Sequence, residues 1–242
     1  MSVIRGVDSK VFINDVPLYG KTTSMSLQST VGVISYNVLK NEGTLKLPSI
    51  GMYTFNLNGV WSNFDALSLE KISQDNLQTE TAKLVWLIES VPPVGGCLDG
   101  SFPTNYQVNT PLDNLVAIQG TWVNTDSLCS GIVLLNEVTV SATGAITGVD
   151  FGALTTTGGK AFLIVSTITG TATNAQIKLQ SDDNSGHSST TDEGTFTFSA
   201  VGVYELDLTG TVDRYVRANT VTLGGATSFV CTLLVGLNGV TQ

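Results

Sequence analysis

The residues with the greatest capacity for chemistry gather in one polar segment, Ser181–Ser189, which contains the chain's single histidine. Serines, Asp182 and His187 supply the residue types of a Ser-His-Asp triad. A triad needs a histidine held by packing and by an acid, whereas a segment this polar predicts a solvated loop. No GxSxG elbow, HExxH helix or phosphate-binding glycine loop occurs elsewhere. We therefore predict no catalytic residue and no enzymatic activity.

The same segment and its flank hold side chains with hard oxygen ligands, the kind that calcium prefers. They are Asp182, Asp183, Asn184, Asp192 and Glu193. Their spacing does not match an EF-hand, which places a bidentate acid at position twelve and a glycine at position six. Acidic turns between strands are common without metal, so we expect no metal ligand and no cofactor.

Two arginines, Arg214 and Arg217, flank a Tyr-Val pair. Residues three apart on a strand point to opposite faces, so these arginines are not expected to form one basic patch. We expect one of them to make a salt bridge, either at an interface or within its own domain.

Aromatic and thiol side chains are predicted to be core residues. Trp61, Trp86 and Trp122 each lie in or beside an apolar strand, which favours packing over stacking on a sugar. The cysteines Cys97, Cys129 and Cys231 are sparse and show no CxxC spacing. They are read as buried free thiols, although the sequence leaves a Cys97–Cys129 bridge open.

Composition limits the classes of partner. The 242 residues include 11 basic and 20 acidic side chains, which give a net charge of −9 spread over both halves. Without a basic patch, tight nucleic-acid binding is not expected. No apolar run approaches the roughly 18 residues of a membrane-spanning helix. The start of the chain also lacks the apolar core of a secretion signal, so we expect assembly in a cytoplasm and no membrane partner.

Short strands with a period of two dominate the first quarter of the chain. Ser24–Gln28, Thr44–Leu47 and Tyr53–Asn58 each alternate polar and apolar side chains, as expected of a half-buried antiparallel sheet. The apolar face would carry Met25, Leu27, Leu45, Leu47, Tyr53, Phe55 and Leu57. The polar face would carry Ser24, Ser26, Gln28, Thr44, Thr54, Asn56 and Asn58.

Alternation breaks down between the first two of these strands, in the apolar segment Val31–Gly43. One interpretation is a buried strand of this domain. The other is a loop that contacts a neighbouring subunit. In the second case the contact residues would be Val31, Val33, Ile34, Tyr36, Val38 and Leu39.

Further along, the spacing of apolar residues from Phe64 to Leu77 predicts the one helix. Lys83–Ile88 predicts a buried strand, closed by the breaker Val91–Gly96. Strands at residues 104–108 and 115–123 complete a first domain, residues 1–145. Residues 146–242 carry apolar strands at the 8–12 residue spacing of a β-sandwich. We predict an all-β chain with one short helix, in which a tail-tube-type sandwich or barrel domain precedes a second β-sandwich domain.

The segment VFINDVPLYGKTTSMSLQSTVGVISYNVLKNEGTLKLPSIGMYTFNLNGVW, residues 11–61, resembles the opening of the tail tube (major tail) proteins of long-tailed bacteriophages. The order of hairpin, helix and further strands is also similar. In the second half, Thr147–Val165, Lys178–Asp182 and Arg214–Arg217 resemble the C-terminal portion of some tail proteins of such phages.

This resemblance implies a structural virion protein whose copies form a ring, of six subunits, that stacks into a tube. The polar face would line the lumen, through which DNA passes without specific binding, past small polar and acidic groups. The segment Val31–Gly43 would reach the neighbouring ring, and residues 146–242 would project outward. Partners would be the tape measure, terminator and baseplate proteins of the tail, and assembly would take place in the host cytoplasm.

Three alternatives stay open at this stage. A carbohydrate-binding or adhesin-type virion surface protein would use the second domain as its sugar reader. A hydrolase on a β-sandwich is disfavoured because no acid–base pair lies in a plausible pocket. If the second domain is itself tube-like, a trimer of two-domain chains could replace the hexamer.

Overall fold

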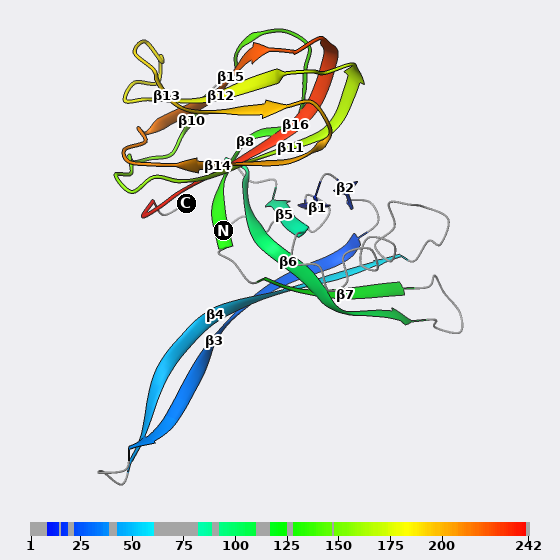
Figure 1. Cartoon of the computed structure of the whole chain (residues 1–242), viewed down its shortest axis with the longest axis vertical. Helices are drawn as coiled ribbons and strands as arrows, with labels where there is room; N and C mark the ends of the chain where they lie inside the picture. The colour runs from blue at the N-terminus through cyan, green and yellow to red at the C-terminus, as the bar shows by residue number, and fades with distance from the viewer. Residues whose placement is uncertain are drawn as a thin grey trace. The chain divides into compact units, whose positions relative to one another are not determined.

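The computed structural model describes residues 9–14, 16–18, 22–38, 43–60, 82–88, 92–109, 117–124, 128–146 and 148–240. Throughout these residues the chain forms β-strands joined by turns, which confirms the predicted all-β class (Figure 1). The predicted helix at 64–77 and Trp61 lie outside the described residues. In the part of the chain just defined there is no helix, and hence none suited to crossing a membrane.

Contacts divide the chain into two compact units. Unit 1 comprises Met1–Tyr19, Lys83–Cys97 and Cys129–Gln242, and unit 2 comprises Gly20–Ala82 and Leu98–Leu128. The predicted boundary at residue 145 falls inside unit 1. Whether residues 146–242 fold on their own stays a prediction.

The strands of unit 1 form two sheets. One sheet begins with the strands β14-β11-β16-β8, in that order. It continues through the start of β6 to β5, β1 and β2. The other has the order β10-β15-β12-β13, with β9 beside β15. The bounds are β1 (Ser9–Ile13), β2 (Val16–Pro17), β5 (Ala82–Ile88), β6 (Val94–Asn109), β8 (Leu128–Val140), β9 (Gly144–Ala145), β10 (Val149–Asp150), β11 (Gly159–Gly170), β12 (Ala175–Asp182), β13 (Thr191–Phe198), β14 (Gly202–Leu208), β15 (Tyr215–Thr222) and β16 (Ala226–Leu237).

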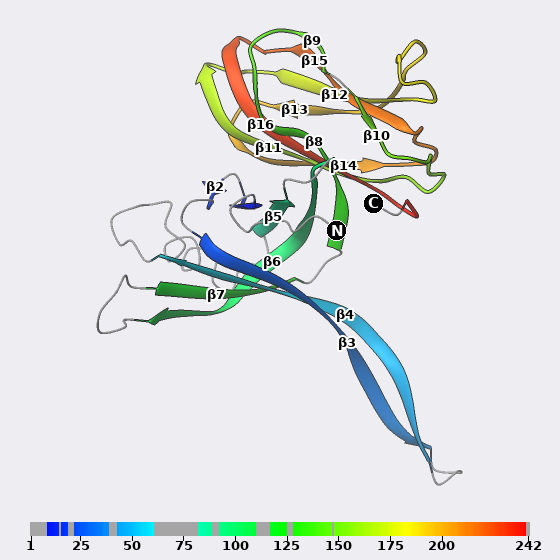
Figure 2. The same cartoon turned by 180° about the vertical axis from the view of Figure 1, so that it is seen from behind.

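The main core of unit 1 lies between these two sheets, which Figures 1 and 2 show as stacked layers. From β11 it receives Ala161, Leu163 and Val165, and from β12 it receives Ile177 and Leu179. These five side chains are fully buried. The sheets therefore form a β-sandwich, stabilised by apolar surface removed from water.

A second core covers the opposite face of the same central strands. The intervening residues Phe162 and Ile164 of β11 pack with Phe12 of β1 and with Val85 and Leu87 of β5. Because β5 and β1 belong to the same sheet as β11, that sheet folds over on itself. The buried strand predicted at Lys83–Ile88 is confirmed as β5.

Close approach between β5 and β6 explains why the predicted breaker Val91–Gly96 is partly a strand. A Cβ atom on Gly96 would stand 2.3 Å from Cζ2 of Trp86. Glycine at this position lets the indole lie against the β6 backbone, and β6 already begins at Val94. The prediction that this segment interrupts the strands is therefore wrong from Val94 onward, where β6 begins.

The aromatic and thiol predictions can be checked at most positions. Trp86 and Trp122 are buried, as predicted. None of the three cysteines forms a disulfide; Cys97 and Cys231 are buried, and Cys129 is half-buried. Burial raises the pKa of Cys231 to about 12 and that of Cys129 to about 11, so both remain neutral thiols.

Unit 2 is built on a sheet of β3 (Thr22–Val38), β4 (Gly43–Val60), β7 (Ala117–Asn124) and the remainder of β6. β3 pairs with β4, β4 with β7, and β7 with β6, all antiparallel. β7 pairs with β4 only from Thr54 onward, so the far part of β3 and β4 is a two-stranded ribbon. Figure 1 shows this ribbon as a long hairpin extending from unit 2.

Within unit 1, one carboxylate joins two strands far apart in sequence. Glu205 on β14 accepts hydrogen bonds from Lys160 on β11 and, at 2.6 Å, from Lys83 on β5. The Lys83 ammonium also lies 5.3 Å from the centre of the Phe162 ring. Burial opposes the ionisation of Glu205, but the two lysines together outweigh it and lower its pKa to about 2.

This lowered pKa predicts a loss of stability in acid. A carboxylate whose pKa is lower in the folded state contributes fully above about pH 4.5, and loses that contribution as the pH falls toward 2. Glu205→Gln should therefore reduce the free energy of unfolding by about 2 kcal/mol at pH 7 and by much less near pH 2.5. Urea titrations at both pH values measure this difference.

Asp207→Asn is the matched control, because Asp207 lies on the same strand, 3.7 Å from Lys160, and is 72% exposed. It should change the unfolding free energy little at either pH. Equal effects of the two substitutions, or a Glu205→Gln effect that does not depend on pH, would contradict the role of the two lysines.

Candidate functional site

The strongest candidate surface is the polar face of the unit 2 sheet. Two rows of side chains cross its four strands in register, from β3 through β4 and β7 to β6. One row is Ser26, Asn56, Thr121 and Asn105. The other is Ser24, Asn58, Gln119 and Gln107.

Hydrogen bonds connect neighbours within these rows. The Asn58 amide donates to Ser24 Oγ at 2.7 Å, and Thr121 Oγ1 donates to Asn56 Oδ1 at 3.0 Å. These side chains are exposed or half-buried, and among the side chains described in the two rows none is charged. The face offers neutral hydroxyl and amide groups over the width of the sheet.

The opposite face of the sheet is apolar. Phe55, Leu57 and Trp122 are essentially fully buried, whereas Leu27 on the edge strand keeps 39% of its surface exposed. The alternation read from Tyr53–Asn58 therefore matches the burial of β4, whereas in Ser24–Gln28 Met25 is half-buried and the other four residues are exposed. Thr44, also predicted for the polar face, lies in β4, but its side chain is outside the described residues.

The segment Val31–Gly43 is mainly strand, so its interpretation as a loop is wrong. Residues 31–38 continue β3, and their partners lie in β4 between Gly43 and Gly51. The proposed contact residues Val31, Val33, Ile34, Tyr36 and Val38 lie on this ribbon, with side chains outside the described set. Leu39 is outside the described residues altogether, and the contact role stays a prediction.

Hydrogen bonds to the Asp182 carboxylate connect the two ends of the polar segment 181–189. Asp182 is 1% exposed, and its carboxylate accepts backbone N–H groups of Asn184 at 2.9 Å and Ser189 at 2.8 Å. These two hydrogen bonds lower the pKa of Asp182. His187 is half-buried, with a backbone φ of 49° and an Nδ1 atom that has no partner. The loop on both sides of the histidine is exposed, as predicted, whereas His187 itself is half-buried.

No triad or metal centre forms in this region. Asp192 binds Lys178 and Gln180, and Glu193 binds Ser181, so both acids of β13 are paired with side chains of β12. Across the residues that the structure describes, no group of three potential ligands could hold a metal ion. One arginine prediction is confirmed, because Arg214 forms a salt bridge with Asp150 inside its own unit.

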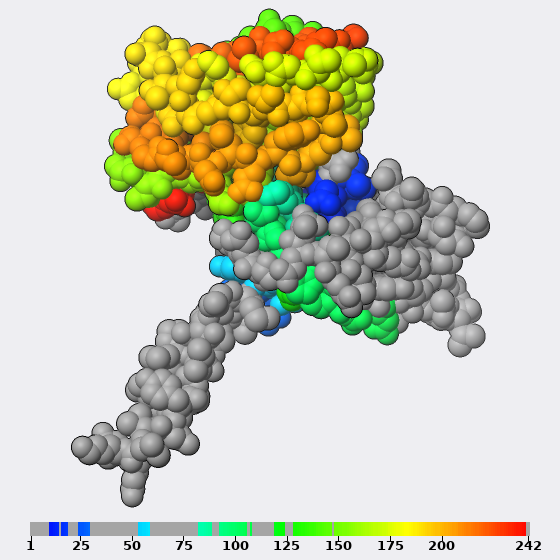
Figure 3. All heavy atoms as spheres, in the orientation of Figure 1, coloured from blue at the N-terminus to red at the C-terminus, as the bar shows by residue number. Residues whose placement is uncertain are grey.

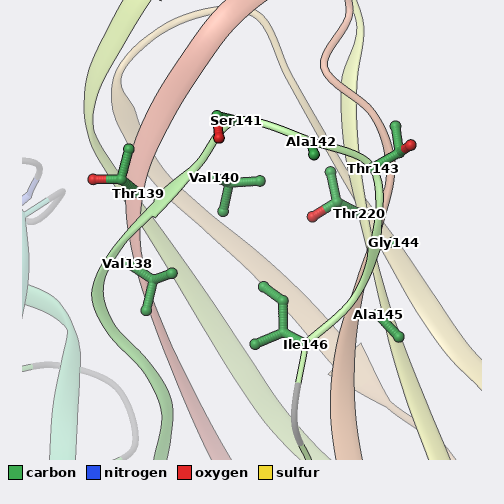
Figure 4. A pocket seen from close by; sticks show the side chains of 10 residues that line it. All are labelled: Val138, Thr139, Val140, Ser141, Ala142, Thr143, Gly144, Ala145, Ile146 and Thr220. Carbon is green, nitrogen blue, oxygen red and sulfur yellow. The ribbon is translucent and has the colours of Figure 1, made fainter.

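An open hollow of about 280 Å³ lies where β8 passes into β9 (Figure 4). Its lining includes Val138, Val140 and Ile146, together with Thr220 of β15. Thr220 is 2% exposed, yet its hydroxyl has no hydrogen-bond partner. Sequence gave no signal for this hollow, because it depends on the pairing of Gly144 with Thr220 across the sheet.

No protein-family model matches the chain, and no significant match occurs among curated proteins. Solved structures that resemble it include the tube-terminating cap of the anti-feeding prophage, at 14% identity over 55% of this chain and 93% of that one, with a TM-score of 0.41. A sheath–tube complex of an extracellular contractile injection system is similar at 12% identity over 54% of this chain and 92% of the other, with a TM-score of 0.40. The Dit protein of phage SPP1, described as a hub of the adsorption apparatus, covers 95% of this chain and 98% of its own, at 10% identity and a TM-score of 0.36.

The unpartnered Thr220 hydroxyl gives a testable stability prediction. Thr220→Val keeps the shape of the side chain and removes a buried polar group that lacks a partner, so it should raise the free energy of unfolding by about 1 kcal/mol. Thr222→Val is the control, because the Thr222 hydroxyl accepts the Gly224 N–H at 3.0 Å and its loss should destabilise. Chemical denaturation measures both. A destabilised Thr220→Val protein would show instead that this hydroxyl is paired in solution, for example with water in the hollow.

Proposed function

We propose that this protein is a structural subunit of a phage-type tail, and that its copies assemble into a ring through unit 2. The observation that carries the proposal is the neutral polar face, backed by an apolar face, of the β3-β4-β7-β6 sheet. Such a sheet fits a wall with water on one side and a packed layer on the other.

The edges of this sheet support ring formation. Among the described pairings, β3 has one strand neighbour, β4, so its other edge leaves backbone groups without a strand partner. From Ser101 to Asn109, the pairing described for β6 is with β7. Joining the β3 edge of one copy to the β6 edge of the next is a head-to-tail contact, and repeated rotation closes it into a ring.

In this arrangement the two rows that contain Ser24 and Ser26 line the lumen, together with Gln28 and Thr54. Neutral hydroxyl and amide groups give DNA phosphates no cation to bind, so DNA passes without being held. The hexamer and the role as a stacked tube remain those implied by the sequence resemblance. Location in the virion tail and partnership with tape measure, terminator and baseplate proteins belong to the same proposal.

Self-assembly is the first expected outcome. Light scattering after size exclusion should show a ring-sized species, and negative-stain microscopy should show a central hole. Mass per ring separates six subunits from three. A protein that stays strictly monomeric at high concentration would contradict the ring.

The two-stranded ribbon, in which residues 43–53 of β4 pair with β3 alone among the described strands, is expected to connect one ring to the next. Replacing residues 32–50 by Asn-Gly would join Val31 to Gly51, which pair in β3 and β4, through a two-residue hairpin turn. This variant should fold and form single rings without stacking. The double substitution Ile34→Asp with Leu39→Asp, which keeps the ribbon length, should also prevent stacking. Tubes of normal length from both variants would exclude the ribbon as the stacking contact.

A further inference from the structure

Arg214 and Arg217 are three residues apart and have very different partners. Arg214 donates to both oxygens of Asp150, at 2.6 and 2.7 Å, so a carboxylate neutralises its charge. Arg217 donates through Nε to Oε1 of Gln180 at 3.0 Å. Within the described part of the chain, this neutral amide is the hydrogen-bond partner found for Arg217. Its charge therefore has no counter-ion there.

A chain of hydrogen bonds fixes the direction of this guanidinium. Gln180 on β12 is 8% exposed, and its Nε2 donates to Asp192 Oδ1 at 2.7 Å. The other oxygen of Asp192 accepts Lys178 Nζ at 2.6 Å. The amide oxygen of Gln180 is thus held toward Arg217, while Asp192 is paired with Lys178. The two Nη groups of Arg217 remain for an external acceptor, in the fork geometry that suits an oxyanion.

His187 stands on the other side of Arg217. Val149 pairs with Val216, so Gly148 lies beside Arg217 in the sheet. A Cβ atom on Gly148 would stand 2.2 Å from Nε2 of His187, which means that the imidazole occupies the space above this glycine. The loop that carries His187 lies at one end of the sandwich (Figure 3, yellow). Burial first, and then the charge of Arg217, lower the pKa of His187, so the imidazole is neutral at pH 7.

Other side chains on this face suit a ligand rich in hydroxyl groups. Lys178 has Asn219 of β15 as one cross-strand neighbour and Thr195 of β13 as the other. All three are exposed or half-buried and can donate hydrogen bonds to a hydroxyl oxygen. The face thus combines one unneutralised, oriented cation with neutral polar groups.

We propose that this face of the β10-β15-β12-β13 sheet binds an acidic saccharide, whose carboxylate or phosphate is held by the Nη groups of Arg217. The sugar hydroxyls contact the neighbouring amide, hydroxyl and ammonium groups. This site is independent of ring formation, because all of its residues lie in one sheet of unit 1.

Titration of the full chain with D-glucuronate and with glucose 6-phosphate, followed by NMR or calorimetry, tests the site. Both should bind more tightly than D-glucose, which lacks the charge, and than acetate or inorganic phosphate, which lack the sugar. The stronger of the two acidic sugars identifies the oxyanion. Equal binding of acetate, phosphate and the acidic sugars would overturn the saccharide assignment. Absence of binding by both acidic sugars at millimolar concentration would overturn the site.

Two substitutions make the test specific. Arg217→Gln should weaken binding of the acidic sugar by about tenfold, because a charge-assisted pair is lost. Arg214→Gln removes the same charge from a neighbouring arginine that is already paired with Asp150, and should change binding less than about twofold. Equal losses in the two variants would show attraction by net charge alone and would contradict the site. Thermal unfolding of each variant establishes that it is folded under the conditions of the titration.

Discussion

The antiparallel ladder between β11 and β16 is the constraint on which unit 1 depends. Alternate residues of β11 enter different cores, with Leu163 on the sandwich side and Phe162 on the side of β1 and β5. A slip of one residue would exchange Phe162 with smaller Ala161, and so place wrong volumes in both cores at once. The register is therefore fixed from two sides, which is stricter than in a sheet with one wet face. Within unit 1, the strands of the β10-β15-β12-β13 sheet pack against this ladder through the sandwich core.

Where the sequence alternates clearly, its reading was close to the structure. Lys178 is half-buried while Ile177 and Leu179 are buried, and Asn56 contrasts in the same way with Phe55 and Leu57. Such strands have one wet face, so the pattern of residue types reports the environment directly. The run Ala161–Val165 has no alternation, because both of its faces are buried. The sequence indicated that this run is a strand, but it did not indicate which strands pack on each of its two faces.

Long-range pairing accounts for what the sequence could not provide. β8 pairs with β16 and contributes Ile132 and Leu135 to the sandwich core, so the composition change near residue 145 does not mark an edge of the core. The environment of His187 depends on Gly148, a residue that becomes its neighbour only through the pairing of β10 with β15. The polar residues of the loop predict exposure, which holds for its neighbours, whereas His187 is half-buried because its imidazole occupies the space over Gly148. Arg217 likewise lacks a counter-ion among the described residues because Asp150 pairs with Arg214 instead, and the sequence does not indicate this choice.

The distribution of charge separates the roles of the two units. Described ion pairs such as Lys83–Glu205 and Arg214–Asp150 lie in unit 1, whereas the described side chains of unit 2 include one charged group, Asp99, which accepts the N–H of Gly100. The two described rows of neutral side chains carry little long-range field of their own, which suits the proposed lumen, where a polyanion is neither steered nor held. A surface with one oriented, unneutralised arginine does the opposite, since it selects an anion at close range. In the proposed functions these surfaces lie in separate units, so the requirements of a neutral wall and of an anion-binding face do not conflict within one surface.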